Sequence, residues 1–174
     1  MKSSTRRSPW SRCANVSTTI FFSVSAVALV VFLGPSVTTA AAATASGAFE
    51  EIFGNSVSCA FARASVSNTS HQGWVTTSNV AGCSSPNNAP KTVPAGYIGA
   101  ESRIMRNGNI YCGGAGPVYN SSTASHITVR ANLIVSSSCP SGTGTYNGDG
   151  GGYRWSLGES VYKVAFAISP SLNF

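Results

Sequence analysis

Charged residues are scarce in this 174-residue chain: Lys, Arg, Asp and Glu together make up 9% of it, and 5 residues are acidic. Only 2 residues are histidines, which leaves few groups for acid–base chemistry near neutral pH. The sequence contains no Gly-x-Gly-x-x-Gly, no Gly-x-x-x-x-Gly-Lys-Ser/Thr and no Gly-x-Ser-x-Gly pattern. It therefore predicts neither a nucleotide site nor the nucleophile turn of a serine hydrolase, and we expect no cofactor and no bound metal.

The first 45 residues differ from the rest of the chain. They open with four cations and no acid: Lys2, Arg6, Arg7 and Arg12. An apolar run extends from Ile20 to Leu33, Gly34 and Pro35 interrupt it, and small residues follow. This layout is typical of a secretory signal peptide. A membrane anchor is the alternative, but the apolar run is shorter than the roughly 20 residues that a span needs.

Two small-x-small patterns place the cleavage between about residues 40 and 46, either at Ala40–Ala42 or at Ala43–Ala45. The Arg6-Arg7 pair leaves a twin-arginine export route open beside the general one. We expect residues 46–174 to form a secreted, extracellular domain without a transmembrane segment. Of the 11 cationic residues, 7 lie in this domain, together with 5 acidic residues. This excess of positive charge is too small to form the basic surface that a nucleic-acid-binding protein needs.

Four cysteines remain once Cys13 is removed with the signal: Cys59, Cys83, Cys112 and Cys139. An even number in an oxidising compartment predicts two disulfides, for which three pairings exist. We expect Cys59–Cys83 and Cys112–Cys139, because neighbouring cysteines often close local loops. A structural metal site is the weaker interpretation, since no Cys-x-x-Cys pair occurs.

The domain is rich in Gly, Ser, Thr, Asn and β-branched residues and has few charged helix formers. This composition predicts an all-β fold, a small antiparallel sandwich or barrel of about seven short strands. The segment Phe49–Val66 predicts one or two strands, or a short helix over Phe49–Phe53. Trp74–Thr77 is a short strand candidate. Asn107-Gly108 predicts a tight turn between strands over Tyr97–Arg106 and Asn109–Cys112.

Residues Ser125–Val135 alternate with a period of two, which predicts a half-buried strand. Its apolar face holds Ile127, Val129, Ala131, Leu133 and Val135, and its polar face holds His126, Thr128, Arg130 and Asn132. The Gly-rich stretch Ser136–Gly152 predicts a flexible region in which Thr143–Tyr146 could still pair, followed by a strand over Tyr153–Ser156. Apolar residues on both faces of Ser160–Ser169 predict a strand in the centre of a sheet.

Short motifs in the C-terminal half resemble a group of small secreted proteins of Gram-positive bacteria. They include Pro94-Ala95-Gly96-Tyr97-Ile98-Gly99-Ala100 with Arg103 following, Tyr119-Asn120-Ser121-Ser122, and the final Ser169-Pro170-Ser171-Leu172-Asn173-Phe174. The Asn-Gly turn and Gly144-Thr145-Tyr146 belong to the same pattern. The resemblance implies secretion and a β-rich fold. It implies no activity and no functional residue.

Each polar residue that could take part in catalysis or metal binding has a simpler structural explanation. His71 and His126 are the available imidazoles, and we expect His126 to face solvent. A glycosidase needs two carboxylates beside a cleft. Glu101 would lie in mid-strand, where an ion pair with Arg103 or Arg130 explains it more simply. Asn147-Gly148-Asp149-Gly150 lacks the further spaced oxygens of a calcium loop.

Aromatic residues are plentiful among these few charges, and exposed Tyr and Trp beside Asn, Ser and Gly make adaptable contact surfaces. Tyr153 and Trp155 share one face of their predicted strand and are the candidate binding residues. The leading hypothesis is a secreted, non-catalytic module that binds a cell-surface polymer or a protein partner. The alternatives are a bacteriocin-like or toxin-like antagonist and a cell-wall or polysaccharide hydrolase acting through Glu101 or Asp149.

Overall fold

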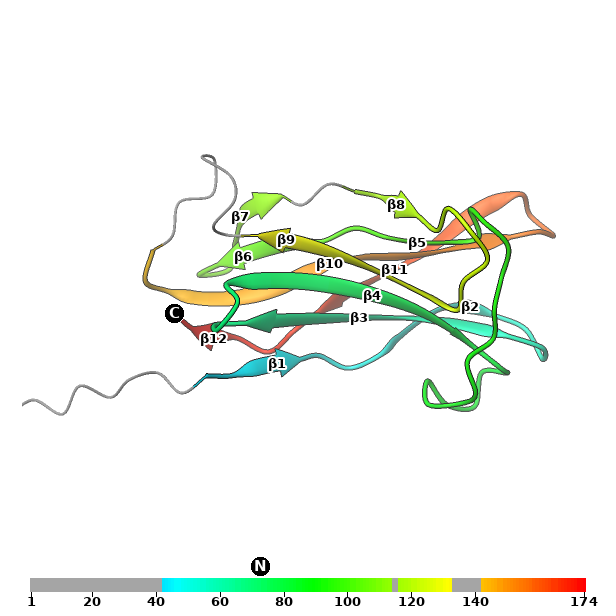
Figure 1. Ribbon diagram of the computed structural model, residues 1–174, viewed down its shortest axis with the longest axis horizontal. Helices are drawn as coiled ribbons and strands as arrows, with labels where there is room; N and C mark the ends of the chain where they lie inside the picture. Colours follow the sequence, from blue (N-terminus) through cyan, green and yellow to red (C-terminus); the bar gives the residue numbers. More distant parts are fainter. Residues whose placement is uncertain (1–41, 114–115, 133–141) are drawn as a thin grey trace, which may run out of the picture. The chain divides into compact units, whose positions relative to one another are not determined.

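The computed structural model describes residues 42–113, 116–132 and 142–174, and these form two antiparallel sheets (Figure 1). The five-stranded sheet contains β1 (Thr44–Ser46), β2 (Glu50–Gly54), β3 (Cys59–Ser67), β4 (Gln72–Val80) and β9 (His126–Asn132). The seven-stranded sheet contains β5 (Ile98–Ala100), β6 (Arg103–Arg106), β7 (Asn109–Gly113), β8 (Val118–Tyr119), β10 (Thr145–Ser156), β11 (Val161–Ile168) and β12 (Leu172–Asn173). The predicted all-β class is confirmed, with more strands than expected. Nothing in these ranges forms a helix able to cross a bilayer.

Strand β10 is the centre of the seven-stranded sheet. Along one side it pairs with β6 and then with β5, and along the other with β12 and then with β11. Strands β7 and β8 extend the sheet beyond β6 and β5. In the other sheet β3 pairs with β4 on one side and with both β1 and β2 on the other, and β9 completes the far side of β4.

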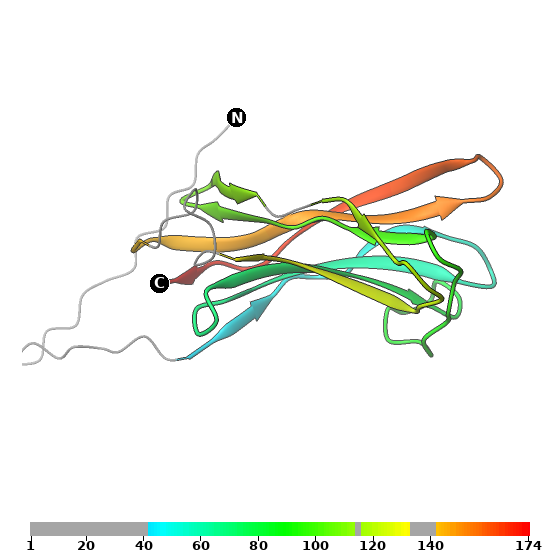
Figure 2. The same cartoon turned by 45° about the horizontal axis from the view of Figure 1, so that its top comes forward.

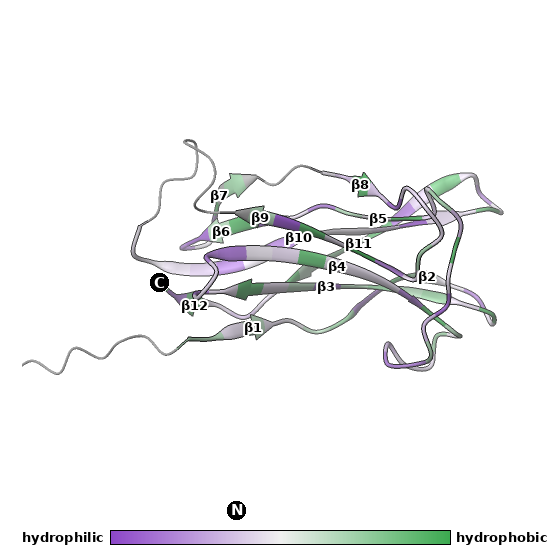
Figure 3. Ribbon diagram, in the orientation of Figure 1, coloured by the Kyte–Doolittle hydropathy of each residue, from purple (hydrophilic) through white to green (hydrophobic). Residues whose placement is uncertain are grey.

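The core lies between the two sheets and is built largely from small side chains. Strand β9 alternates as predicted: Val129 and Ala131 are buried, while His126 and Arg130 are exposed. The hydropathy colouring in Figure 3 shows the resulting mixture of hydrophobic and hydrophilic segments along the strands. Leu133 and Val135 lie outside the described residues.

The Gly-rich stretch is not a flexible region where it can be described, since Gly148–Gly152 lies in the middle of β10. Gly148 and Gly152 are needed because the sheets approach each other closely at these two positions. A Cβ atom at Gly152 would lie 2.6 Å from Cβ of Ala62 and 2.7 Å from Oγ1 of Thr77 in the opposite sheet. The prediction that Thr143–Tyr146 could pair is confirmed for Thr145 and Tyr146. The flexible-region prediction is wrong for residues 147–152, and residues 136–141 lie outside the described ranges.

Strand β11 lies at an edge of its sheet and not at the centre (Figure 2). It pairs with β10, and no other strand pairs with it within the described ranges. One face carries side chains that are 37–58% exposed: Tyr162, Val164, Phe166 and Ile168. The prediction of a central strand was wrong because apolar residues on both faces do not require a second neighbour.

The remaining strand predictions are close to the structure. Phe49–Val66 contains two strands and no helix, and β4 is longer than the predicted Trp74–Thr77. The predicted strand over Tyr97–Arg106 is interrupted at Glu101 and Ser102, although β5 and β6 keep one register against β10. Asn107 and Gly108 adopt φ of 49° and 81°, so the predicted tight turn is confirmed.

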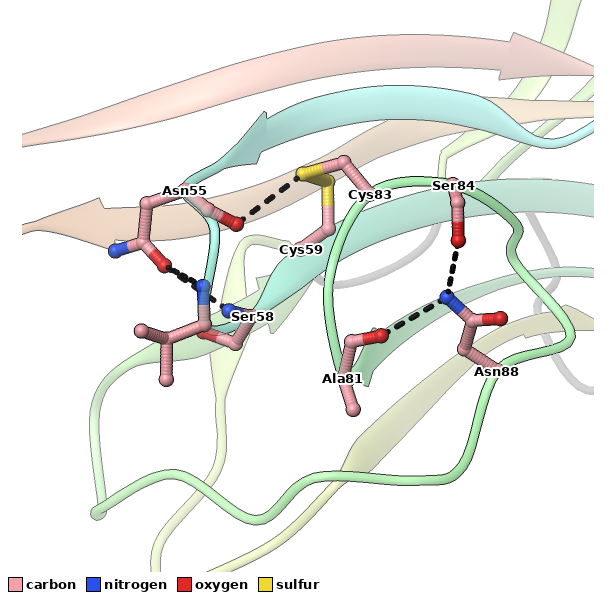
Figure 4. Close-up of a disulfide and its surroundings, with 8 residues drawn as sticks. Asn55, Ser58, Cys59, Ala81, Cys83, Ser84 and Asn88 are labelled. Carbon is pink, nitrogen blue, oxygen red and sulfur yellow. Dashed lines mark hydrogen bonds between the residues drawn. A yellow bond between two sulfur atoms is a disulfide. The ribbon is translucent and has the colours of Figure 1, made fainter.

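The predicted disulfide between Cys59 and Cys83 is present, with the two Cα atoms 5.0 Å apart (Figure 4). Around it, the side chain of Asn55 accepts hydrogen bonds from the backbone N–H groups of Val57 and Ser58. The side chain of Asn88 donates to the carbonyl of Ala81 and to Oγ of Ser84. These local contacts hold the two loops that the disulfide joins.

The second predicted disulfide falls partly outside the described residues. Cys112 is buried in β7 and does not carry a free thiol, but Cys139 is not among the described residues. The pairing of Cys112 with Cys139 stays a prediction.

The position of β1 helps to choose between the two predicted cleavage sites. It begins at Thr44, and Ala45 packs against the core cluster that contains Val66. The backbone N–H of Ala43 also donates a hydrogen bond to the side chain of Asn68. A cut after Ala45 would remove most of β1, whereas a cut after Ala42 would keep it whole. Of the two predicted sites, the first therefore fits the fold better.

Candidate functional site

The outer face of the seven-stranded sheet carries a cluster of four aromatic side chains, called here the aromatic platform. Its members come from three strands: Tyr119 in β8, Tyr153 and Trp155 in β10, and Tyr162 in β11. Ring centroids are 4.5 Å apart for Tyr119 and Tyr162, 4.9 Å for Trp155 and Tyr162, and 6.1 Å for Tyr119 and Tyr153. Each ring is partly open to solvent.

Sheet register brings these rings together. Trp155 lies opposite Tyr162, and Tyr153 lies opposite Gly99, which in turn lies opposite Tyr119. Because Gly99 has no side chain, the Tyr119 ring lies over its backbone; a Cβ atom there would be 2.6 Å from the ring. The Tyr119 ring therefore reaches across β5 to contact the rings on β10 and β11.

The platform continues into an apolar strip along β11. Val164, Phe166 and Ile168 point to the same face as Tyr162 and are 44%, 58% and 58% exposed. The guanidinium of Arg103 lies 5.8 Å from the centroid of the Phe166 ring. This distance suits a cation–π contact at an exposed position.

A carboxylate lies beside the rings. Burial, followed by the hydrogen-bonding and charge effects of the Glu101 carboxylate, raises the pKa of Tyr153 to about 12. Burial, followed by the nearby Tyr162 and Glu101, also raises the pKa of Tyr119. The neutral phenols therefore persist in alkaline solution, where they remain hydrogen-bond donors.

The two carboxylates that the hydrolase alternative would use have other neighbours. Asp149 forms an ion pair with Arg103, with 2.9 Å between Oδ2 and Nη2. Arg103 pairs with Asp149, and no ion pair joins Glu101 to Arg103 or Arg130 within the described residues, so that prediction was wrong. The cause is the break at Glu101 and Ser102, together with the position of Arg130 in the opposite sheet. The Asn147–Gly150 segment lies inside β10 and is not a loop.

One end of the platform is hollowed into a shallow pocket of about 220 Å³. The pocket is lined by Ala95, Gly96, Tyr97, Trp155 and Tyr162. The Tyr162 hydroxyl donates a hydrogen bond to the carbonyl of Gly96, at 2.5 Å, and fixes the wall of the pocket. Arg154 lies 5.5 Å from the centroid of the Tyr97 ring. The pocket thus offers aromatic faces beside peptide groups.

The histidines lie away from the platform. His126 is exposed on β9, as predicted, and His71 contacts the Phe174 ring edge-on at 5.5 Å. Glu51, Cys59 and Cys83 place three potential metal-ligand atoms within 4.8 Å of one another. The two sulfur atoms form a disulfide, so they are not thiolate ligands.

The structure places the predicted Tyr153 and Trp155 together on an open face and adds Tyr119 and Tyr162 to them. Sequence reasoning missed Tyr162 because its strand was assigned to the centre of a sheet. It missed Tyr119 because a two-residue strand has no detectable period. One sequence signal could have identified Tyr162 as an outward-facing residue. The large side chains on its face of the strand alternate with Lys163, Ala165 and Ala167 on the other face. No family model, no curated protein and no solved structure matches this chain.

Proposed function

We propose that this protein is a secreted, non-catalytic module that binds a cell-surface polysaccharide through the aromatic platform. The observation that carries the proposal is the gathering of four partly exposed rings from three strands on one open sheet face. An open face suits a long polymer, because a chain can cross it without an end having to enter a cavity.

The chemistry of the platform matches a sugar chain. The apolar C–H faces of pyranose rings can stack on the Trp and Tyr rings, while the phenol hydroxyls hydrogen-bond to sugar hydroxyls. Glu101 adds an acceptor beside Tyr153. Arg103 and Asp149 neutralise each other next to the strip, so the face favours a neutral or weakly charged polymer.

The same face does not favour hydrolysis. A glycosidase holds two carboxyl groups roughly 5–10 Å apart across the scissile bond, one of them free to donate a proton. Asp149 is engaged by Arg103, and Glu101 lies close enough to the Tyr153 phenol to raise its pKa. The resemblance to secreted proteins of Gram-positive bacteria directs the proposal to cell-wall polymers as the first target.

Co-sedimentation of the purified protein with insoluble cell-wall polymer tests the proposal. We expect Trp155→Ala and Tyr162→Ala each to weaken binding by about tenfold, which corresponds to ~1.4 kcal/mol. The matched control is Trp74→Ala. Trp74 is also partly exposed, but it lies in β4 and stacks with Arg130, 5.3 Å from the ring centroid. This variant should bind as the wild type does.

The supernatant is assayed for released sugars in the same experiment. Binding without release, weakened in the Trp155→Ala and Tyr162→Ala variants but not in Trp74→Ala, supports the proposal. Equal losses for Trp155→Ala and Trp74→Ala would show that the platform is not the binding surface. Release of sugars would overturn the non-catalytic assignment, and a lack of binding would overturn the choice of polymer.

A further inference from the structure

The free edge of β11 carries backbone groups that no strand satisfies within the described part of the chain. The four exposed side chains of its outer face, on Tyr162, Val164, Phe166 and Ile168, are all apolar or aromatic. Edge strands normally carry a charge, a proline or a bulge that discourages pairing. The outer face of β11 has none of these. Its one charged side chain, Lys163, points to the inner face and is neutralised by Glu159, so the edge can still receive another strand.

The direction of these backbone groups follows from the hydrogen bonds of β10. The N–H of Trp155 donates to Tyr97, and the carbonyl of Gly151 accepts from Glu101, so these residues of β10 face β5. Alternate residues of β10 face β11, where Gly152 lies opposite Ala165 and Arg154 opposite Lys163. Tyr162, Val164 and Phe166 therefore direct their N–H and C=O groups to the free edge.

From this pattern we infer that a second copy of the chain pairs with the first through β11, antiparallel and symmetric about Val164. In this register Val164 lies opposite Val164 of the partner subunit, and Tyr162 lies opposite Phe166 of the partner subunit. Each of these is a hydrogen-bonded pair, because all three residues present their backbone groups at the edge. The two-fold axis makes the contact identical on both subunits.

Charge and space allow this register. Lys163 points to the inner face, is paired with Glu159, and would lie opposite Ala165 of the partner subunit, so no like charges meet. At the end of the strand, a side chain at Gly47 would collide with the carbonyl of Ile168, so that carbonyl is already covered. A register centred on Val164 pairs the backbone groups of Tyr162, Val164 and Phe166, which no other strand occupies within the described residues. It leaves Ile168 out of the central pairs.

The dimer joins two seven-stranded sheets into one, with both outer faces on the same side. The apolar strips of the two subunits meet, and the two aromatic platforms lie on one continuous surface. The contact of a single edge strand is small, so we expect a weak and reversible dimer with a dissociation constant on the order of micromolar. The inference does not depend on which polymer the platform binds.

Sedimentation velocity tests the inference, with protein recovered from the expressing cell and its N-terminus assigned by mass spectrometry. The wild-type protein should shift from monomer to dimer as its concentration rises from about 1 to 100 µM. Val164→Lys and Val164→Glu should each raise the dissociation constant by about tenfold or more, because like charges then face each other across the axis. An equal mixture of the two variants should dimerise again.

Leu157→Lys is the control for the added charge, since Leu157 is 70% exposed in the turn before β11 and lies off the edge. It should dimerise as the wild type does. A wild-type protein that stays monomeric at all concentrations would overturn the inference, as would a dimer that Val164→Lys leaves intact. Failure of the Lys and Glu variants to associate when mixed would exclude the register centred on Val164.

Discussion

The ring of Tyr119 lies directly over the backbone of Gly99, its partner in the neighbouring strand. This contact between a large ring and a residue without a side chain lowers the ring onto the sheet. It also brings the Tyr119 ring to 4.5 Å from that of Tyr162, which lies beyond both β5 and β10. The aromatic platform therefore depends on a glycine as much as on its aromatic members.

Gly99→Ala should disrupt the platform. The added methyl group would lie 2.6 and 2.8 Å from two ring carbons of Tyr119 and 3.1 Å from the carbonyl of Val118. We expect the free energy of unfolding to fall by about 1–3 kcal/mol, as for other additions to tightly packed sites. Urea unfolding measures this change, and co-sedimentation measures the accompanying loss of polymer binding.

Gly158→Ala is the matched control for this substitution. No atom lies within 4 Å of the position that its Cβ would take, and Gly158 belongs to the turn between β10 and β11. Its stability should be unchanged or slightly higher. If Gly99→Ala and Gly158→Ala had equal free energies of unfolding, the close contact of Tyr119 with Gly99 would not contribute to stability.

Tyr153 should titrate well above the ordinary tyrosine pKa of 10.0. Burial is the larger cause of its pKa of about 12, and the hydrogen bond to Glu101 is the second. Since the folded pKa lies above the unfolded one, the associated stability is fully present below pH 10. It is lost as the pH rises from about 10 towards 12. Ultraviolet absorbance of the phenolate follows the titration.

The Glu101→Gln variant separates the effect of burial on the Tyr153 pKa from the effect of the Glu101 carboxylate. Removing the carboxylate charge should lower the pKa of Tyr153, but not fully to 10.0, because the burial remains. Tyr153→Phe should abolish this titration step. A Tyr153 pKa that Glu101→Gln leaves unchanged would show that the carboxylate does not act on the phenol.

The Cys59–Cys83 disulfide should be a major source of stability. It closes a loop over a sequence separation of 24 residues, and Cys59 is fully buried beside Phe61 and Val80. Replacing both cysteines by alanine should lower the free energy of unfolding by about 3–4 kcal/mol, from the lost constraint on the unfolded chain. Denaturant titrations of the wild type and the double variant provide the measurement.

Peptide mapping under non-reducing conditions accompanies this comparison. It should recover a linked pair containing Cys59 and Cys83, and it tests the predicted link of Cys112 to Cys139. The two alanines should leave polymer binding intact, because neither cysteine belongs to the platform. A double variant as stable as the wild type would contradict the assigned role of this disulfide.

Several features of the fold could be predicted because their signals are local. The alternation over His126–Ala131 follows from one buried and one exposed face, and the Asn107-Gly108 turn follows from two residues with positive φ. The Cys59–Cys83 pair joins cysteines that are neighbours in the sequence. In each case the residues that carry the signal lie within one element or one loop.

Predictions failed where a position depends on a distant segment. The glycines of β10 indicated flexibility because the sequence does not show that Ala62 and Thr77 lie against Gly152. Strand β11 was placed at the centre of a sheet because its two apolar faces do not show how many neighbours its edges have. Glu101 was expected to pair with Arg103 or Arg130, but Arg103 pairs with Asp149 in β10, and Glu101 acts on the Tyr153 phenol instead.

The sequence by itself determined the all-β class, the tight turn, one disulfide and two of the four rings of the platform. Composition, residue spacing and the conformational limits of Asn and Gly were sufficient for these. Tertiary structure alone decided that Tyr119 and Tyr162 join Tyr153 and Trp155, and that β11 is an edge strand. The register between strands that are distant in the chain sets these contacts, and that register depends on how both sheets pack as a whole.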